Sequence, residues 1–530
     1  MNQENAANAI KSGETVLGIE LGSTRIKSVL INASHEVIAS GSYGWENSYV
    51  SGLWTYELSA AIEGLQKSYA SLAEDARSKY GTDIENISAI GISGMMHGYL
   101  VLNEKGVQLS KFLTWRNTNT TEAASKLIET FDYNIPLRWS IAQLYQAILE
   151  GQEHVSNINY ITTLAGYIHL KLSGEKVIGI GDASGMFPID SEIKDFNQKM
   201  LAQFSVLVQG KYKWDIRKIL PKVLVAGENA GYLTEDGARL LDPSGKLRAG
   251  IPMAPPEGDA ETGMTATNSV AVNTGNVSTG TSIFSMVVLK KQLSKLYREI
   301  DMVTTPSGMP VAMVHCNNGT SEIDAWFGIF KRFAECSGIE LKNNEIYDIL
   351  YRESLEGSLD CDGIVTFNYL SGEPITGTTE GRPLVVRKAD SDFSLANFMR
   401  SQIYSVLATL VIGMQILTDE NVIIKRLTCH GGLFKTSGVA QRYMAAATNS
   451  SVTVMDNAGE GGPFGMALLA AYMKFRNPGE SLDDYLQKKV FDISKGSTVV
   501  PNTQEVEGYA RYLQKYRQAL KTEMSAVENI

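Results

Sequence analysis

Hydrophobic residues near the start of the chain fall into two short runs that flank a polar turn. From Val16 the sequence reads VLGIELGSTRIKSVLIN, with Gly-Ser-Thr between two β-rich apolar stretches, which predicts a β-hairpin. Residues 56–80 carry apolar side chains at helical spacing, and residues 87–92 form a buried-strand pattern that ends in GISGMMHG. Strand, helix and strand in this order are typical of an α/β layer.

The opening pattern occurs a second time about 250 residues later, which predicts two related domains. Residues 269–289 again place a Gly/Ser/Thr turn between two apolar runs. The expected organisation is a polar lead-in at 1–14, an N-terminal domain at 15–267, a C-terminal domain at 268–500 and a helical tail at 501–530.

Composition indicates a large globular protein. A chain of 530 residues with 44% hydrophobic and 20% charged residues is too long for one core. The net charge of −10, with both signs interspersed, provides no basic stripe, so no nucleic-acid partner is expected. The four cysteines lie far apart without a C-x-x-C motif, which predicts reduced, buried thiols instead of a disulfide framework or zinc site.

Targeting signals are not expected from the sequence. The first residues lack a basic region followed by an apolar one, which a signal peptide would have. The most apolar later stretch, residues 404–417, is shorter than the roughly 18 residues that a membrane span needs. We therefore expect a cytoplasmic protein with no membrane partner.

Two polar turns are the candidates for binding phosphate groups. A Walker A motif is absent from the sequence, but backbone N–H groups and hydroxyls in a turn can also hold phosphates. A single turn of this kind is usually only a hairpin turn. One in each predicted domain is a more specific signal, given by Gly22, Ser23 and Thr24 and again by Gly280, Thr281 and Ser282.

Several segments, in this order, resemble the FGGY family of carbohydrate kinases, particularly its xylulokinases. GIELGSTRIKSVLIN and VSTGTS are similar to its two phosphate motifs, and AIGISGMMHGYLVLNEKG with FLTWRNTNT to its sugar-binding segment. GDASGMFPID resembles its D-A-S-G-T stretch, PMAPPEGDAETG falls at its catalytic aspartate, and LTCHGGLFKTSGVAQRY opens its adenosine motif. The resemblance implies an α/β fold of two actin-like ATPase (ribonuclease H-like) domains, with the active site in the cleft between them.

The resemblance also implies ATP-dependent phosphorylation of a small sugar, with a pentulose such as xylulose as the leading acceptor. Asp259 is then the base that accepts the proton of the sugar hydroxyl, although an aspartate after a Pro/Gly turn is otherwise an ordinary helix cap. The implied substrate-binding residues are Met96, His97, Trp115, Arg116, Asn117, Asp182 and Asp259.

Two of these residues have structural explanations as well. His97, beside two methionines after a strand, fits a core histidine equally well. Asp182 lies in a D-A-S-G sequence, where the aspartate is often only the side chain of an Asx-turn.

ATP and Mg²⁺ are the implied cofactors. Glu20, acting through water, is the expected metal-organising residue. The implied nucleotide-binding residues are Gly22, Ser23, Thr24, Lys27, Gly280, Thr281, Ser282, Gly431, Gly432, Gly462 and Gly465. Glycine lets the backbone approach a ligand, but tight strand-to-helix turns also explain the last four glycines.

The sequence departs from the family pattern at the metal and sugar positions. Glu20 stands where the family has aspartate, and the extra methylene displaces the carboxylate on a scale that affects catalysis. The family's W-x-D-x-R is replaced by Trp115-Arg116-Asn117-Thr118-Asn119. The identity of the sugar and the oligomeric state, a homodimer included, therefore stay open.

Three alternatives to a pentulose kinase remain at this stage. One is a kinase of gluconate or another sugar acid, whose carboxylate Arg116 can pair. The others are a non-catalytic actin-like ATP switch and a sugar sensor. The set of Met96, His97, Trp115 and Asp259 favours the kinase, because a pure switch needs no sugar site.

Overall fold

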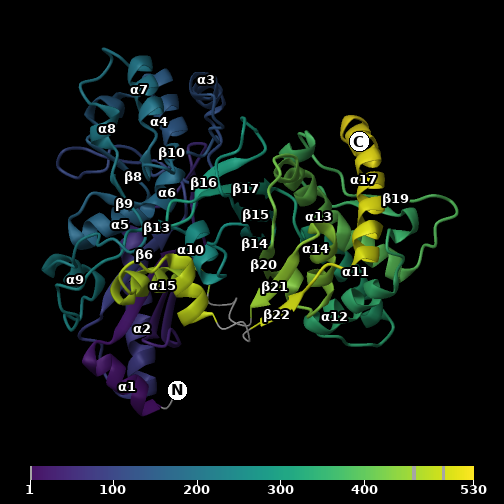
Figure 1. Ribbon diagram of the computed structural model, residues 1–530, viewed down its shortest axis with the longest axis horizontal. Helices are drawn as coiled ribbons and strands as arrows, with labels where there is room; N and C mark the ends of the chain where they lie inside the picture. The colour runs from purple at the N-terminus through teal and green to yellow at the C-terminus, as the bar shows by residue number, and fades with distance from the viewer. Residues whose placement is uncertain (1–2, 456–460, 492–495) are drawn as a thin grey trace. The chain divides into compact units, whose positions relative to one another are not determined.

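The computed structural model describes residues 3–455, 461–491 and 496–530. It forms two compact units, each built from three stretches of chain (Figure 1). The first unit comprises Met1–Val270, Asp301–Val311 and Gly459–Asp492, and the second comprises Ala271–Ile300, Ala312–Ala458 and Ile493–Ile530. The division thus differs from the single boundary expected near residue 268, because two later segments pack with the first unit.

The first unit contains a central sheet, several two-stranded ribbons and twelve helices among its described residues. The strands are β1 (Thr15–Leu21), β2 (Arg25–Asn32), β3 (Val37–Gly44), β4 (Ser48–Val50), β5 (Leu53–Thr55), β6 (Ala89–Gly94), β7 (Leu100–Leu102), β8 (Tyr160–Thr162), β9 (Val177–Gly179), β10 (Ile189–Asp190), β11 (Asp195–Phe196), β12 (Lys222–Leu224), β13 (Glu257–Gly258) and β16 (Asp301–Thr304). The helices are α1 (Gln3–Ser12), α2 (Leu58–Tyr80), α3 (Thr121–Phe131), α4 (Ser140–Leu149), α5 (Leu164–Ser173), α6 (Ile180–Ser184), α7 (Gln198–Leu207), α8 (Ile216–Ile219), α9 (Glu235–Leu241), α10 (Asp259–Ala266), α15 (Gly461–Phe475) and α16 (Leu482–Tyr485).

The central sheet of this unit has the order β13-β6-β1-β2-β3. β1 pairs antiparallel with β2 and parallel with β6, and β6 pairs parallel with β13. The predicted hairpin, the predicted helix at 56–80 and the predicted strand at 87–92 are confirmed as β1–β2, α2 and β6. Since β1, β6 and β13 run in the same direction, their carboxyl ends lie at one edge of the sheet.

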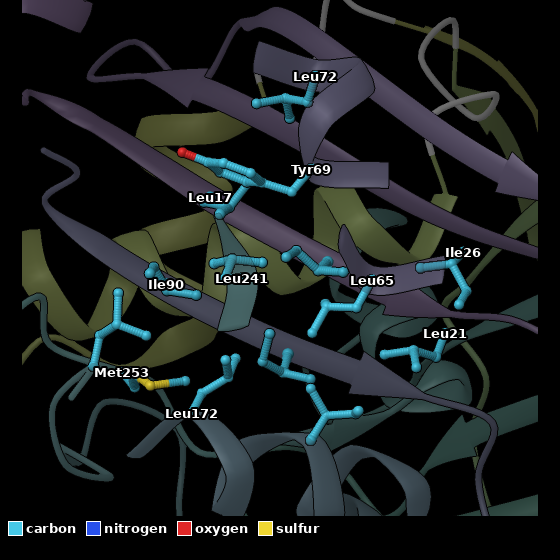
Figure 2. Packing of buried hydrophobic residues seen from close by; sticks show 14 of the residues in the cluster. Leu17, Leu21, Ile26, Leu65, Tyr69, Leu72, Ile90, Leu172, Leu241 and Met253 are labelled. Atoms are coloured by element: carbon cyan, nitrogen blue, oxygen red, sulfur yellow. The ribbon is translucent and has the colours of Figure 1, made fainter. Parts of the chain in front are cut away.

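Alternation along β1 sends its side chains to the two faces of the sheet. Leu17 and Leu21 belong to a buried cluster that includes Leu65 and Tyr69 of α2 and Leu172 of α5 (Figure 2). Burying large aliphatic and aromatic side chains contributes roughly 1.5–3 kcal/mol each. This cluster forms a hydrophobic core between the sheet and its covering helices in the first unit.

The opposite face of β1 is covered by α15, which comes from late in the sequence and appears yellow beside the purple strands in Figure 1. A Cβ atom at Gly18 of β1 would overlap the carbonyl oxygen of Pro463 in α15, and one at Gly91 of β6 would lie 2.5 Å from the Met466 side chain. Glycines in the strands thus let the helix pack closely against the sheet.

The second unit contains a sheet with the order β17-β15-β14-β20-β21-β22. The strands of the unit are β14 (Thr274–Thr279), β15 (Ile283–Val288), β17 (Pro310–Cys316), β18 (Val365–Phe367), β19 (Leu384–Val386), β20 (Arg426–Gly431), β21 (Ser451–Met455) and β22 (Gly496–Val499). The helices are α11 (Ser321–Cys336), α12 (Asn343–Glu353), α13 (Leu395–Asp419), α14 (Val439–Thr448) and α17 (Thr503–Asn529). The predicted second strand–turn–strand and the helical tail are confirmed as β14–β15 and α17.

Two segments are more structured than the sequence suggested. The apolar stretch at 404–417 is part of α13, a helix of 25 residues that is long and apolar enough to cross a membrane. Of its most apolar window, 72% is buried inside the structure, as in a core helix. The polar lead-in contains α1, which buries Ala6 and Ile10.

The cysteines follow the prediction with one exception. All four are free, and Cys316, Cys361 and Cys429 are buried. Cys336 is exposed instead, because it lies in the last turn of the amphipathic helix α11.

Candidate functional site

The turn between β1 and β2 is held by its carbonyl groups. Trp45 donates from its ring Nε1 to the Gly22 carbonyl at 2.7 Å and from its backbone N–H to the Thr24 carbonyl at 3.2 Å. The Tyr56 hydroxyl donates to the Ser23 carbonyl at 2.6 Å, and the Trp45 and Tyr56 rings pack with centroids 4.3 Å apart. Because these carbonyl groups already accept hydrogen bonds, the hydroxyl groups of Ser23 and Thr24 are the groups of the turn that can bind a ligand.

Asp259 begins α10 directly after the short strand β13. Because β13 and β6 are parallel, with Gly258 opposite Gly94, the residue lies beside the segment that follows β6. The backbone N–H of Met96 donates to Asp259 Oδ1 at 3.0 Å. Burial raises the pKa of this carboxyl, and the hydrogen bonds from the Met96 and Ala260 N–H groups oppose that rise. Asp259 is thus a fixed carboxylate with raised basicity at the carboxyl edge of the sheet.

His97 adopts a backbone conformation that few residues other than glycine tolerate. Its φ is 69°, and only 5% of it is exposed. Its ring Nδ1 lies 3.4 Å from the Gly185 carbonyl oxygen, and a Cβ atom at Gly185 would overlap the ring. Strained conformations at positions of this kind cost of order 1–3 kcal/mol and are concentrated at functional sites. The backbone strain favours a functional role over that of an ordinary core histidine.

Trp115, Arg116 and Asn117 lie beside Trp54 of β5. The Arg116 guanidinium carbon is 3.8 Å from the centroid of the Trp54 ring and 6.0 Å from that of Trp115. The Asn117 amide accepts from the Trp54 N–H at 2.9 Å and donates to the Trp54 and Thr114 carbonyls at 2.8 and 3.1 Å. Asn117 therefore secures the aromatic platform of Arg116, and its amide is already occupied by backbone groups.

Asp182 lies in helix α6 with no exposed surface. Its Oδ2 accepts from the Thr163 hydroxyl at 2.6 Å, and its backbone N–H donates to Glu257 Oε2 at 2.9 Å. Burial raises its pKa well above the usual range, and the charges of Glu257 and Asp259 add to the rise. Because Asp182 has no exposed surface and bonds to Thr163, its predicted contact with the sugar stays a prediction.

Glu20 faces the start of α15. It stands opposite Lys27 in the β1–β2 register, and a Cβ atom at Gly462 would overlap its carboxylate. Burial raises the pKa of Glu20 to about 8, the charge of Asp259 adds to the rise, and Lys27 opposes it. The coupling indicates that Glu20 and Asp259 are close enough for their charges to repel.

A divalent cation fits this pair of carboxylates. Mg²⁺ typically keeps several waters and binds through one or two carboxylates plus substrate phosphates. In the described part of the chain no three histidine, cysteine, aspartate or glutamate side chains are grouped to hold a metal ion by themselves. The arrangement therefore matches an ion held through water and phosphate, and a cation there would offset the repulsion.

The turn between β14 and β15 repeats the construction of the first. The backbone N–H of Thr320 donates to the Gly280 carbonyl at 2.9 Å, and that of Gly319 donates to the Thr281 carbonyl at 2.7 Å. The Gly280 N–H closes the turn on the Ser282 carbonyl at 2.9 Å. Here too, the carbonyls are engaged by neighbouring backbone.

Gly431 and Gly432 lie beside this second turn. β20 runs parallel to β14 with Gly431 opposite Thr279, so the two carboxyl ends are adjacent. Gly431 has a φ of 109°, and a Cβ atom there would overlap the Thr279 carbonyl oxygen, whereas a Cβ at Gly432 would meet nothing within 4 Å. Gly431 is thus required by the backbone, and Gly432 leaves open space where a flat ring can approach.

Gly462 and Gly465 lie in α15 of the first unit. A Cβ atom at Gly465 would overlap the Thr262 carbonyl oxygen in α10, and Gly462 faces the Glu20 carboxylate. Packing of α15 on α10 explains Gly465, and the Glu20 carboxylate of β1 explains Gly462, so a nucleotide contact is not needed to account for either glycine.

The structure thus groups the predicted residues within each unit. In the first, Glu20, the Gly22 turn, His97 and Asp259 lie at the carboxyl ends of parallel strands, where ligands bind in open α/β sheets. In the second, the Gly280 turn and Gly431 do the same. The sequence did not indicate that Trp45 and Tyr56 bond to the Gly22 turn or that Trp54 lies under Arg116. It also did not indicate that Glu257 and Glu261 are buried, because no feature of the motifs distinguishes a buried acid from an exposed one.

Family models agree with the order of these motifs. The N-terminal domain model of the FGGY family of carbohydrate kinases matches residues 15–264, and its C-terminal domain model matches residues 275–473. A xylulose kinase of Haemophilus influenzae is 20% identical over 512 residues, which cover 94% of this chain and 98% of that protein.

Solved structures share the fold. The xylulose kinase from Rhodospirillum rubrum matches with a TM-score of 0.78 at 16% identity, and the gluconate kinase from Lactobacillus acidophilus with 0.77 at 16%. Both matches cover 96% of this chain and 98% of the other. The expected two-domain α/β fold of actin-like ATPase (ribonuclease H-like) type is confirmed.

Proposed function

The chain belongs to the FGGY family of carbohydrate kinases and is therefore a sugar phosphotransferase that uses ATP, and we propose that its acceptor is a pentulose such as xylulose. The observation that carries the proposal is the Asp259 carboxylate, fixed by the Met96 N–H beside the strained His97. The Haemophilus influenzae relative, similar over nearly its whole length, is a xylulose kinase.

The proposed reaction begins with the sugar hydroxyl within hydrogen-bond reach of Asp259. The carboxylate accepts the hydroxyl proton while the sugar oxygen forms a bond to the γ-phosphorus and the bond to the ADP oxygen breaks. Its raised pKa strengthens the base. The His97 ring and the Trp115 indole, which is 41% exposed, are proposed to orient and cover the sugar.

The two turns are proposed to hold the phosphates of ATP. The hydroxyls of Ser23 and Thr24, with Lys27, serve this purpose in the first unit, and Thr281 and Ser282 serve it in the second. Gly431 and Gly432 are proposed to let the backbone approach the adenosine. When bound, Mg²⁺ would neutralise charge on the phosphates, and Glu20 would hold it through water.

Replacing Glu20 by glutamine is expected to raise the Mg²⁺ concentration for half-maximal activity by about 10- to 100-fold, the usual effect of losing an outer ligand partner. The amide keeps the shape that packs on Gly462, but it cannot ionise to offset the charge of a bound cation. A Mg²⁺ titration at saturating ATP and sugar measures the effect, with Glu14→Gln at an exposed site as control. Equal Mg²⁺ requirements in wild type and Glu20→Gln would remove Glu20 from the metal site.

A sugar acid such as gluconate is the second candidate acceptor. Arg116 is held over Trp54 and forms no ion pair among the described residues, so its charge is available to a carboxylate. The Lactobacillus acidophilus neighbour is a gluconate kinase. A homodimer, a cytoplasmic location and the lack of nucleic-acid or membrane partners stay predictions from the sequence.

An ADP-release assay with MgATP over a panel of ketoses, polyols and sugar acids tests the proposed function. ADP release that depends on a pentulose is the expected result. Release with gluconate but not with xylulose would favour the second candidate. ATP turnover indifferent to every sugar, or none despite ATP binding, would support a switch or a sensor instead.

A further inference from the structure

The segment that follows β17 holds the Gly280 turn in place. Gly319 donates its backbone N–H to the Thr281 carbonyl at 2.7 Å, and Thr320 donates its backbone N–H and its hydroxyl to the Gly280 carbonyl at 2.9 and 3.2 Å. A Cβ atom at Gly319 would lie 2.2 Å from the Gly280 carbonyl oxygen. The two stretches of backbone are thus in direct contact, and the position of the turn follows that of residues 319 and 320.

Asn318, which precedes this pair, is bonded through its side chain to the loop at residues 368–373. It is 4% exposed. Its Oδ1 accepts from the N–H groups of Leu370 and Ser371 at 2.9 and 3.1 Å. Its Nδ2 donates to the Ser371 carbonyl and to Glu373 Oε2, both at 3.1 Å. A side-chain amide has two N–H donors and an oxygen with two lone pairs, so every hydrogen-bonding position of the Asn318 amide is used.

Two buried side chains of the same loop bind the backbone around Asn318. Glu373 Oε2 also accepts from the Asn318 backbone N–H at 3.2 Å, and Asn368 Nδ2 donates to the carbonyls of Asn318 and Gly319 at 3.1 and 2.8 Å. Glu373 has no exposed surface, and Asn368 is 1% exposed. Leaving a buried donor or acceptor unpaired is costly, so these bonds fix residues 318 and 319 against the loop.

The two turns are therefore held in different ways. Trp45 and Tyr56 reach the carbonyls of the Gly22 turn with their own side chains. In the Gly280 turn the contacts come from the neighbouring segment, and the side chains that fix this segment meet at Asn318. Groups that bind a ligand need to be held to within about 0.5 Å by the residues around them. For the second turn this task falls to the amide of Asn318 and its two partners.

We propose that Asn318 is a positioning residue for nucleotide binding, and that it acts with Asn368 and Glu373 through the backbone of the Gly280 turn. The inference rests on the proposed role of that turn in holding the phosphates of ATP. The affinity for the nucleotide should then depend on the Asn318 amide, although the groups that bind the phosphates belong to the turn.

Asn318→Asp tests the proposal because the new side chain has nearly the same size but no N–H donors. It would place a carboxylate against Glu373 and leave the Ser371 carbonyl without this partner. The Kd of the β,γ-imido analogue of ATP, measured by titration calorimetry with Mg²⁺ and without sugar, should rise by about 10- to 100-fold, the usual range for losing an outer partner of a binding group. In turnover, the KM for ATP should rise and the KM for the sugar should stay near the wild-type value.

Asn397→Asp is the matched control in the same unit. Asn397 is 1% exposed, and its Nδ2 donates to the Asp392 carbonyl at 2.9 Å and to Asp392 Oδ2 at 3.1 Å. The same change therefore sets a carboxylate against a carboxylate and a carbonyl. Asn397 lies at the start of α13 and its Oδ1 holds the Ser358 N–H rather than the turn. The thermal midpoint of Asn397→Asp should fall, and its Kd for the analogue should stay at the wild-type value.

A variant of the turn itself, with Thr281→Val and Ser282→Ala together, separates this inference from the proposed function. Weaker binding in the turn variant and a wild-type Kd in Asn318→Asp would overturn the inference alone. A wild-type Kd in both would remove the turn from the nucleotide site, and the inference with it. Equal losses of affinity in Asn318→Asp and Asn397→Asp would make Asn318 a structural residue only, which also overturns the inference.

Asn368→Leu is a second, milder variant. It removes only the two hydrogen bonds to the carbonyls of residues 318 and 319, so it should raise the Kd in the same direction but by less. It decides the comparison if Asn318→Asp does not fold. A wild-type Kd in Asn368→Leu, with weaker binding in the turn variant, would then overturn the inference.

Discussion

Replacing Asp259 by asparagine is expected to lower kcat by about 10²- to 10⁴-fold, the usual contribution of a general base. The amide keeps the size of the side chain and an oxygen that accepts from the Met96 N–H, but it cannot take the hydroxyl proton. ADP release at saturating sugar and MgATP gives the measurement. The pKa of Asp259 is raised, so this base is protonated at a higher pH than an ordinary carboxyl group. As the pH is lowered, the kcat/KM of the wild type should therefore begin to fall at a higher pH than an ordinary carboxyl base would give.

Stability separates a catalytic loss from a folding loss in this variant. A carboxyl whose pKa is raised by folding stabilises the native state at low pH and costs stability once it is ionised. Asp259→Asn should therefore unfold at the same temperature as wild type or higher at neutral pH. Asp236→Asn, at a side chain that is 99% exposed, is the matched control and should keep full activity. Turnover within tenfold of wild type in Asp259→Asn would assign the base to another residue.

Elements with strong local patterns were predicted correctly from the sequence. The β1–β2 hairpin and its later counterpart β14–β15 each have two β-rich runs around a Gly/Ser/Thr turn, and turn chemistry of this kind acts over a few residues. The same locality explains α2. The positions of the Gly22 and Gly280 turns at strand ends follow from these elements.

Long-range packing lay beyond the sequence. Most of α15 falls within the range of the C-terminal family model, yet this helix packs against β1 and α10 of the first unit. Its glycines suggested a nucleotide contact because a glycine required by a ligand and one required by a neighbouring helix look alike in sequence.

The surroundings of the base were unpredictable for a similar reason. Glutamates are usually exposed, and the sequence PPEGDAE does not show that Glu257 and Glu261 are both buried against Asp182. Asn117 was expected at the sugar because of its motif position, but its amide bonds to Trp54, a residue 63 positions away. These contacts depend on how distant segments meet.

Replacing Gly465 by alanine is expected to destabilise the protein by about 1–3 kcal/mol or more, the range for overpacking a core. The new methyl group would overlap the Thr262 carbonyl oxygen, which is backbone and cannot rotate away. Gly462, at the start of α15, lies against the Glu20 carboxylate. A shift of this helix should therefore raise the Mg²⁺ requirement as well as lower the stability. Thermal unfolding and a Mg²⁺ titration on the same preparation measure both effects.

Gly263→Ala is the matched control for that substitution, because it lies in α10, the helix that Gly465 contacts. A Cβ atom at Gly263 would meet nothing within 4 Å, and alanine in a helix interior is favoured over glycine by roughly 0.5–1 kcal/mol. This variant should therefore be as stable as wild type or more stable, with an unchanged Mg²⁺ requirement. If Gly465→Ala instead unfolds at the wild-type temperature, α15 has room to move away from α10. In that case the close packing of α15 on α10 does not fix the position of the Glu20 carboxylate.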